Sequence, residues 1–318
     1  MRAVRYHEHG GPDVLTVEDV DRPTPDDDEL LVAVRAAAVN PVDTYFREGS
    51  YPPGDLPWIP GSDFAGEVAA VGDDVEEFAP GDRVFGTALG NDRPGTCAEY
   101  VAAPTDRVAR LPNGVGFDEG AAVALVGVTA WRALVDHADL EPGERCLVHG
   151  GSGGVGHVAV QLGAAVGARV TTTARETYHD RVDALGADDV LDYARDDLAD
   201  AVRDAGAPDV VLDHRLDDYL QFDADVAAQG GRVVGIGNQD AAAGFEDVPA
   251  ARSKELTLTL MSMFNTPDVA AVLERLARLV ADGAIAPEIA DSYALDAVDE
   301  AHRAVLEESF CGKLVVEL

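Results

Sequence analysis

The chain has 318 residues, with 59 Asp or Glu against 24 Lys or Arg, so its formal net charge is −35. This length predicts about two domains with full apolar cores. No run of roughly 18 apolar residues predicts a membrane-spanning helix, and the strong negative charge disfavours a nucleic-acid partner. The three cysteines are scattered and form neither a disulfide framework nor a zinc-ligand spacing. Segment 1–6 reads as a strand rather than a signal peptide, so we expect a cytoplasmic protein.

The acidic residues are spread along the whole chain instead of forming one tail, and Lys254 and Lys313 are the only lysines. Such a surface repels itself unless salt screens its charges. The composition resembles that of a cytosolic protein from a salt-accumulating halophile. The alternative, an acidic face for a basic partner, is disfavoured because the charge is not localised.

The first 120 residues predict a β-rich domain, because short apolar or alternating runs are separated by turns rich in Gly and Pro. Polar and aromatic residues gather in Asn40–Tyr51, which is expected to form a loop and a short helix. A second such stretch is Pro60–Gly66. The expected strands are 1–6, 15–20, 30–38, 64–71, 83–87, 99–103 and 107–111.

A glycine-rich turn follows between two apolar runs. Arg145–Val148 predicts a buried strand, and His157–Val166 predicts a helix. Between them, Gly151, Gly153 and Gly156 have the Gly-x-Gly-x-x-Gly spacing of a dinucleotide-binding turn. We expect the first glycine to allow the turn, the second to let the backbone approach a pyrophosphate, and the third to let helix and strand pack closely. The alternative, a glycine-rich loop without a ligand, is disfavoured by this strand–turn–helix context.

The end of the next expected strand, 168–173, favours NADP over NAD. An NAD site usually has an acidic residue there, about 20 residues after the start of the fingerprint. Here Arg175 follows the strand, and Glu176 comes after it. Arginine favours a ribose 2′-phosphate, whereas a carboxylate would repel it. The alternative is that Arg175 is a solvated loop residue.

Strands continue to alternate with helices toward the C-terminus, which predicts an α/β architecture with a parallel sheet. An amphipathic helix is expected over 268–282. The further expected strands are 187–192, 209–213, 231–237, 254–263 and 313–318.

Several blocks, in order along the whole chain, resemble the medium-chain dehydrogenase/reductase superfamily, and in particular its zinc-free quinone oxidoreductase branch. The resemblance implies a GroES-like β-rich catalytic domain over 1–122 and 265–318, and a Rossmann doubly wound parallel-sheet domain over 123–264. It also implies a homodimer, because strand 254–263 often pairs across a dimer in this superfamily. The matching blocks are Ala38–Tyr45, Pro60–Gly66, Gly81–Val84, Gly127–Ala130, Gly153–Gly156 and Gly312–Val316.

Zinc-binding members of this superfamily hold their catalytic metal with Cys and a His-Glu pair. Here Asn40 stands where the first Cys is expected, and Gly61-Ser62-Asp63 replaces Gly-His-Glu. The cysteine-rich lobe of the structural zinc is missing, and the eight His residues do not group. Because zinc needs three or four convergent ligands, no metal is expected.

Without a zinc ion to polarise a carbonyl, the expected acceptor is one that takes up electrons readily, a quinone or an enone. Asn40, Tyr45 and Tyr51 are the expected catalytic residues. The resemblance places them along the substrate cleft, where they would orient the acceptor and hydrogen-bond the developing oxyanion. The alternative for both tyrosines is that they only pack. Asp43 is expected to fix the loop through backbone hydrogen bonds.

The resemblance implies NADPH as the cofactor, with Tyr178 in the register of the family's usual lysine after the second strand. Segment Asp213–Asp217 departs from the family, which has a valine followed by glycines there, and this puts the contacts on that side in doubt. The expected cofactor-binding residues are Thr129, Gly151, Ser152, Gly153, Gly154, Val155, Gly156, Arg175, Tyr178, Tyr193, Gly237, Asn238 and Lys313.

The leading hypothesis is therefore a zinc-independent, NADPH-dependent oxidoreductase that transfers a hydride to a quinone. One alternative is an NADPH-dependent reductase of alkenal or enone double bonds, and another is a non-catalytic NADPH-binding protein. The expected partner is a small-molecule quinone or enone, with no nucleic acid and no membrane.

Overall fold

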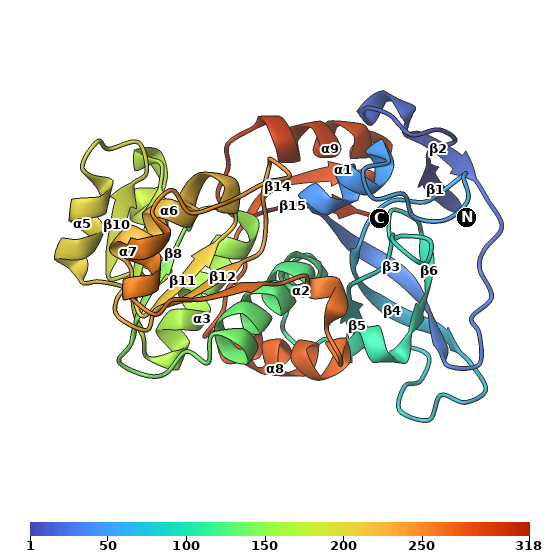
Figure 1. The fold of residues 1–318 in the computed structure, drawn as a ribbon. Coiled ribbons are helices and arrows are strands. Elements are labelled where there is room, and N and C mark those ends of the chain that lie inside the picture. The colour runs from blue at the N-terminus through green and yellow to red at the C-terminus, as the bar shows by residue number, and fades with distance from the viewer. The chain divides into compact units, whose positions relative to one another are not determined.

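The computed structural model describes residues 1–318, which form two compact units (Figure 1). Unit 1 contains Met1–Val128 and Pro267–Leu318, and unit 2 contains Thr129–Thr266. The sequence predicted domain boundaries at 122/123 and 264/265, a few residues earlier. The first boundary of the structure lies inside one continuous helix, α2 (Phe117–Trp131), whose apolar sequence has no break at that point.

A seven-stranded sheet forms the centre of unit 1, in the order β14-β15-β3-β4-β5-β7, with β6 also paired to β3. The 11-residue strand β3 is its middle, because it pairs with β15, β4 and β6. One half of β3 enters the apolar cluster of Leu30 and Val32, and the other half enters the cluster of Ala37 and Val39. The strands are β3 (Glu29–Val39), β4 (Asp63–Val71), β5 (Arg83–Gly86), β6 (Tyr100–Pro104), β7 (Val108–Arg110), β14 (Ile289–Ala294) and β15 (Lys313–Glu317).

Two helices from opposite ends of the chain lie side by side in unit 1, α1 (Pro41–Glu48) and α9 (Val298–Glu307) (Figure 1). The buried face of α9 packs with Leu314 and Val316 of β15. This packing holds the start of β15 against the end of β3, where α1 begins. The remaining named elements of unit 1 are β1 (Arg2–Arg5), β2 (Thr16–Asp19) and α8 (Val269–Ala281), besides short 3-10 turns.

Unit 2 is a six-stranded sheet in the order β10-β9-β8-β11-β12-β13, and every pairing in it is parallel. This is the strand order of a doubly wound dinucleotide-binding fold. The chain proceeds outward from β8 to β10 and then returns to β11 on the other side of β8. Ligands of such sheets bind at the carboxyl ends of the two strands where the order reverses, here β8 and β11. The strands are β8 (Arg145–Val148), β9 (Arg169–Ala174), β10 (Asp189–Asp192), β11 (Val210–Asp213), β12 (Arg232–Gly235) and β13 (Thr257–Leu260).

Helices connect these strands, as the alternating pattern of the sequence predicts. A π-helical turn, Arg132–His137, continues α2 into unit 2. The other helices are α3 (Gly154–Val166), α4 (His179–Ala184), α5 (Leu198–Ala205), α6 (Leu216–Val226) and α7 (Val248–Ser253).

The structure differs from the expected elements mainly between residues 254 and 307. The predicted strand 254–263 is reduced to β13, because Lys254 closes α7 and Glu255 has a left-handed φ of 56°. Strand β14 was not predicted, since its residues are mostly exposed or half-buried and do not alternate. Helix α9 was not predicted either, although its buried positions follow a helical period.

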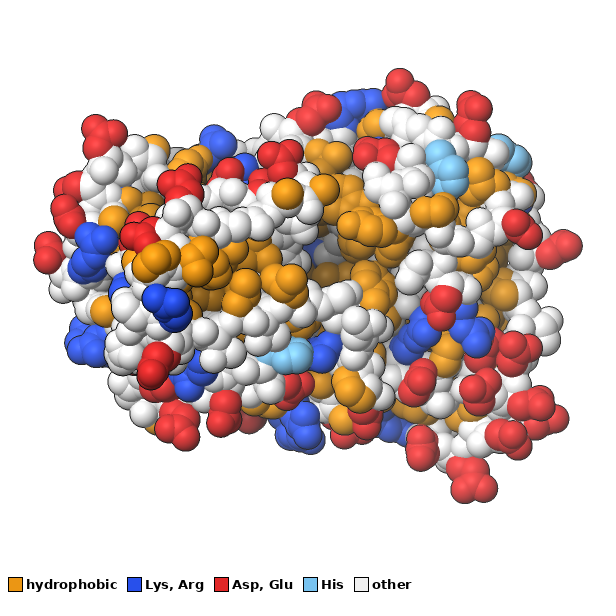
Figure 2. Space-filling view, in the orientation of Figure 1, with side chains coloured by type: hydrophobic (Ala, Val, Ile, Leu, Met, Phe, Trp, Pro, Cys, Tyr) orange, Lys and Arg blue, Asp and Glu red, His pale blue; other side chains and the backbone are white.

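Acidic side chains lie along several margins of the face drawn in Figure 2, with Lys and Arg among them, rather than gathered in one patch. This agrees with the even spread of acidic residues along the sequence. No helix is both long and apolar enough to cross a bilayer.

Candidate active site

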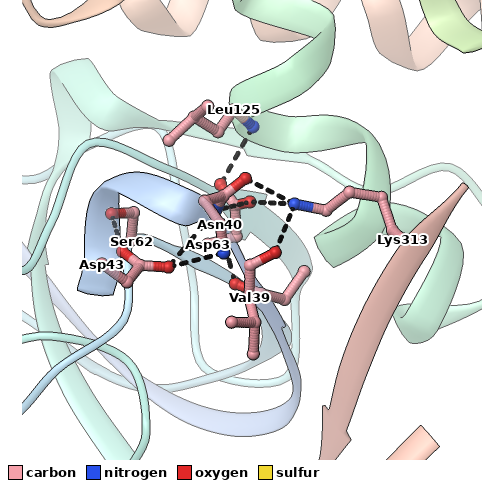
Figure 3. A network of polar contacts seen from close by, with 8 residues as sticks. Val39, Asn40, Asp43, Ser62, Asp63, Leu125 and Lys313 are labelled. Atoms are coloured by element: carbon pink, nitrogen blue, oxygen red, sulfur yellow. Dashed lines mark hydrogen bonds and ion pairs between the residues drawn. The ribbon is translucent and has the colours of Figure 1, made fainter. Parts of the chain in front are cut away.

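A buried polar network in unit 1 joins the end of β3, the start of α1, the start of β4 and the start of β15 (Figure 3). Asn40 is the residue between β3 and α1, and its backbone N–H donates to Asp43 Oδ2 at 2.8 Å. Ser62 Oγ donates to Asp43 Oδ1 at 2.5 Å. As predicted, Asp43 fixes the loop through a backbone hydrogen bond, and it also ties this loop to the segment before β4.

Lys313 places an ammonium group inside the same network. Its Nζ donates to Val39 O at 2.9 Å and to Asn40 Oδ1 at 2.5 Å, and lies 3.7 Å from Asp63 Oδ2. Asp63 in turn accepts from Asn40 Nδ2 at 2.8 Å and from the backbone N–H of Leu125 at 2.9 Å. The ammonium therefore compensates the buried Asp63 carboxylate and fixes the orientation of the Asn40 amide.

Burial sets the protonation behaviour of these groups. It raises the pKa of Asp43 to about 6, with the charge of Asp63 adding to the rise and the hydrogen bond from Ser62 opposing it. Burial also raises the pKa of Asp63, against the attraction of Lys313. It lowers the pKa of Lys313, against the attraction of both carboxylates. Removing one partner from such a buried cluster leaves the charge of another without compensation, which is costly.

Asn40 has no spare donor for a substrate. Its side-chain oxygen accepts from Lys313, and its side-chain nitrogen donates to Asp63 and, at 3.5 Å, to Ala38 O and Asp43 Oδ2. Only 1% of the residue is exposed. The predicted catalytic residue thus lies in the site region, but its amide is already engaged within the protein. Its geometry suits positioning of α1 rather than contact with an acceptor.

The residues at the expected zinc position do not fit zinc. Asn40 and Ser62 offer an amide and a hydroxyl, and the Lys313 ammonium occupies the space beside Asp63. Zinc in proteins prefers thiolate, imidazole and carboxylate ligands, three or four at once. No group of three or more His, Cys, Asp or Glu residues in the structure is arranged to hold a metal ion.

Tyr45 and Tyr51 carry the free polar groups of this region. Tyr45 lies on α1 and is half-buried, and Tyr51 follows the helix and is 60% exposed. Their ring centroids are 6.4 Å apart, and burial raises the pKa of Tyr45. No group of the protein hydrogen-bonds to either phenol oxygen. Both phenols are therefore available as donors to a ligand, and the structure brings them together on one helix and its end.

The glycine-rich turn of unit 2 lies between β8 and α3, as predicted. No side chain caps the start of α3, so the N–H groups of its first turn, including Val155, are left for an anion such as a pyrophosphate. A Cβ at Gly156 would lie 2.0 Å from Gly150 O, so only glycine allows this approach. A Cβ at Gly151 would lie 2.2 Å from Thr172 Oγ1, so this position of the turn also requires glycine, and the preceding Gly150 has a left-handed φ of 70°.

The predicted phosphate-binding residues lie at the edge where β9 and β10 end. These strands pair in parallel, so Arg175 after β9 and Tyr193 after β10 are at the same edge of the sheet. Both side chains are exposed, and Arg175 has no ion-pair partner. Tyr178 is half-buried in the short turn that follows Arg175. This arrangement leaves the guanidinium of Arg175 available to a phosphate group.

The other predicted cofactor residues are more dispersed. Thr129 is buried in α2, and Gly237 O accepts from the backbone N–H of Leu216 at 3.1 Å. Asn238 is exposed, and its Nδ2 donates to Asp240 O at 3.0 Å. Lys313 belongs to unit 1, where its ammonium is engaged as described above. Its contact with a cofactor stays a prediction.

Sequence reasoning missed three buried polar residues. Asp63 was noted only as a replacement for a zinc ligand, although it holds the Asn40 amide. His149 and Asp223 form a buried pair in unit 2, with Nε2 and Oδ1 2.8 Å apart. They are 74 residues apart in the sequence, so no local pattern could have indicated their contact.

Comparisons with known proteins agree with this architecture. A family described as "Alcohol dehydrogenase GroES-like domain" matches residues 26–113, and a family described as "Zinc-binding dehydrogenase" matches residues 185–316. The human quinone oxidoreductase (Homo sapiens) is 36% identical across 100% of this chain and 98% of its own length.

Solved structures give the same result. The crystal structure of an NAD-dependent alcohol dehydrogenase has a TM-score of 0.91 at 33% identity, and covers 100% of both chains. The Escherichia coli quinone oxidoreductase complexed with NADPH has a TM-score of 0.90 at 28% identity, again over 100% of both chains. The predicted fold class and family are confirmed. The chain belongs to the medium-chain dehydrogenase/reductase superfamily, and it is an NAD(P)H-dependent oxidoreductase related to the quinone oxidoreductases.

Proposed function

We propose that this protein transfers a hydride from NADPH to a quinone without the help of zinc. The observation that carries the proposal is the buried network in unit 1, where the Lys313 ammonium and the Asn40 amide fill the position of a metal site. These groups do not supply a Lewis acid to a carbonyl oxygen. A quinone needs little such help, because it becomes aromatic on reduction. The relatedness to human quinone oxidoreductase supports the same acceptor.

The residues of the chain then have separate tasks. The first turn of α3 binds the pyrophosphate, and the guanidinium of Arg175 binds the 2′-phosphate. The phenols of Tyr45 and Tyr51 donate hydrogen bonds to the acceptor oxygen as negative charge develops on it. The network around Lys313 holds α1 in place. When bound, NADPH would supply the hydride, and the one proton that completes the hydroquinone would come from a phenol or from water.

The direct test measures oxidation of NADPH at molar KCl with three acceptor classes: 1,4-benzoquinones, alkenals and simple aldehydes. We expect turnover with quinones at least tenfold faster than with the other two classes. Turnover of alkenals alone would support a double-bond reductase instead. Tight NADPH binding without oxidation by any acceptor would indicate a non-catalytic binding protein.

Two variants refine this test. Tyr45→Phe and Tyr51→Phe keep the rings and remove the hydroxyls, so a packing role predicts unchanged turnover. A hydrogen-bond role predicts a loss of about ten- to a hundredfold in kcat/KM for at least one of them.

Zinc independence is tested by extended dialysis against a chelator, after which activity should persist and metal analysis should find no stoichiometric zinc. One zinc atom per chain would contradict the proposal.

A homodimer formed through β13 is part of the proposal. This strand is at the edge of the sheet of unit 2, and it exposes Leu258 and Leu260, the latter at 71%. An exposed edge strand with apolar residues is a template for pairing with another copy. Light scattering coupled to gel filtration should give a dimer mass for the wild type and a monomer mass for Leu260→Asp. A monomeric wild type would remove this part of the proposal.

A further inference from the structure

Three buried polar residues of unit 2 meet directly beneath the dinucleotide turn. His149 is the residue that follows β8, Asp213 is the last residue of β11, and Asp223 lies on α6. All three are buried, with at most 2% of each residue exposed. His149 and Asp213 lie at the carboxyl ends of β8 and β11, which is the point of the sheet where the strand order reverses and ligands bind.

The hydrogen bonds of this cluster are incomplete unless it holds a proton. His149 Nε2 and Asp223 Oδ1 are hydrogen-bonded at 2.8 Å, and the backbone N–H of Arg215 donates to Asp213 Oδ1 at 2.6 Å; His149 Nδ1 has no partner. The remaining oxygens, Oδ2 of Asp213 and Oδ2 of Asp223, have no donor. A buried acceptor without a donor is costly. The side chains of Asp213 and Asp223 interact by a hydrogen bond, and a hydrogen bond between two carboxyl groups needs one proton.

The environment keeps this proton bound near neutral pH. Burial, followed by the charge of Asp223, raises the pKa of Asp213 to about 7. Beyond these three residues, the titratable or charged groups around the cluster are His214, Arg215, Asp217, Asp218 and Tyr219, which follow β11 or lie on α6, and Tyr193 after β10. The ring of Tyr219 stacks on that of His149 at 4.3 Å, which closes the cluster on that side.

The cluster is connected to the dinucleotide turn by short contacts. His149 directly precedes Gly150. The backbone N–H of His149 donates to Leu212 O, at the end of β11, at 3.1 Å. The ring of His214, the residue after Asp213, lies against Gly150, since a Cβ there would be 2.8 Å from His214 Cε1. A displacement of Asp213 would therefore move both the loop and the ring that supports the turn.

We propose that Asp213, Asp223 and His149 form a proton-holding cluster that positions the dinucleotide turn, and that loss of its proton weakens dinucleotide binding. With both carboxylates ionised, their repulsion separates β11 from α6 and disturbs the contact of His214 with the turn. This gives segment Asp213–Asp217, which departs from the family pattern, a positioning role. The inference rests on the proposed dinucleotide site but not on the identity of the acceptor.

The test is the dissociation constant of NADPH, and separately of NADH, between pH 6 and 8.5 at constant molar KCl. For the wild type we expect a dissociation constant that is flat below pH 6.5 and rises above pH 7. The rise reaches about thirtyfold at pH 8.5 if only the protonated cluster binds the dinucleotide. NADH lacks the 2′-phosphate, so a rise with both cofactors cannot come from that phosphate.

Amide variants imitate the protonated cluster permanently. In Asp213→Asn the side-chain nitrogen takes the place of the protonated oxygen and donates to Asp223, so the pH dependence should shrink to less than threefold. Asp223→Asn gives a second variant with the same expectation. Asp225→Asn is the matched control, because Asp225 is an exposed acid on the same helix, and it should keep the wild-type profile.

Calorimetry in two buffers of different ionisation enthalpy gives an independent readout on the wild type. At pH 7.5 NADPH binding should take up protons, and Asp213→Asn should take up none. His214→Asn should retain the pH dependence; its loss there would assign the titration to His214 and overturn the proposal. Binding that is independent of pH in the wild type would overturn the proposal while leaving the dinucleotide site intact. Binding at no pH would overturn both.

Discussion

The ammonium of Lys313 lies 3.7 Å from Asp63 Oδ2, and both side chains are almost fully buried in unit 1. The two residues are 250 positions apart in the sequence. They meet because β15 pairs with β3, and β3 pairs with β4. Removing one member of such a pair leaves the other charge buried without compensation. The two residues should therefore be strongly coupled in stability.

We expect Lys313→Met to lower the free energy of unfolding by about 3–5 kcal/mol, and Asp63→Asn to have a comparable effect. The double variant should lose clearly less than the sum of the two single losses. The exposed pair Arg35–Glu67 joins β3 to β4, the strand that also holds Asp63, so Arg35→Met is the control, with a loss below about 1 kcal/mol. Urea unfolding of the four variants at fixed KCl measures all of these values. Additive losses at Lys313 and Asp63 would show that the two groups act independently.

Much of this fold is predictable from local sequence. The apolar runs give the strands of unit 2 within a few residues, and the glycine spacing gives the turn before α3. The buried networks are not predictable in this way. The environment of Asn40 depends on Lys313, which reaches it only because β15 returns to pair with β3. Such contacts depend on tertiary pairing, which no local periodicity encodes.

The dependence on tertiary pairing also explains which predicted site residues the structure brings together. Tyr45 and Tyr51 lie close in the sequence and on one helix and its end, so the structure keeps them together. The Asn40 amide was predicted to face the acceptor, but its burial against Asp63 became visible only in three dimensions.

Asp43 gives a prediction about pH. Its pKa in the folded protein is raised to about 6 by burial, above the ordinary value of 3.8. The folded state therefore holds a proton that the unfolded state releases between these two values. The proton bound to Asp43 stabilises the folded state at pH 4, and this stabilisation is lost as the pH rises to about 6. Above pH 6 Asp43 no longer changes the free energy of unfolding with pH.

Asp43→Asn should remove this part of the pH dependence. The difference in unfolding free energy between wild type and variant should change by up to about 3 kcal/mol between pH 4 and 7. Asp55→Asn, at an exposed position nearby in the sequence, should leave the wild-type profile unchanged. Urea unfolding at half-unit pH steps measures the three profiles. Parallel curves for wild type and Asp43→Asn would mean that folding does not change the pKa of Asp43.

Arg175 should distinguish the two nicotinamide cofactors. Its guanidinium is exposed and unpaired at the end of β9, so solvent weakens any contact with a phosphate. Arg175→Ala should raise the dissociation constant of NADPH about five- to tenfold and leave that of NADH nearly unchanged. Arg169→Ala changes an exposed arginine at the opposite end of the same strand and should affect neither. Fluorescence titrations measure both constants, and an equal loss for the two cofactors would remove Arg175 from the phosphate site.

The net charge of −35 gives the last prediction, which concerns the hypothesis of a saline environment. Acidic side chains scattered over the surface repel one another, and they also repel a negatively charged dinucleotide (Figure 2). Between about 0.1 and 1 M salt the Debye length falls from ~10 to ~3 Å, which confines this repulsion to immediate neighbours. Salt also screens the exposed Arg175, but it affects the backbone donors at the start of α3 much less.

The melting temperature should therefore rise steeply from ~0.1 to 1 M KCl, while the affinity for NADPH rises with it and then levels off. Thermal melts and NADPH titrations over one KCl series measure both. A general salting-out effect would give the same rise whatever the surface charge, so a variant with fewer charges is the control. Neutralising the exposed Asp73, Asp74, Glu76 and Glu77 to their amides should lower the KCl concentration at which stability levels off. A melting temperature that stays flat or falls with KCl would show that the acidic surface has a purpose other than stability in salt.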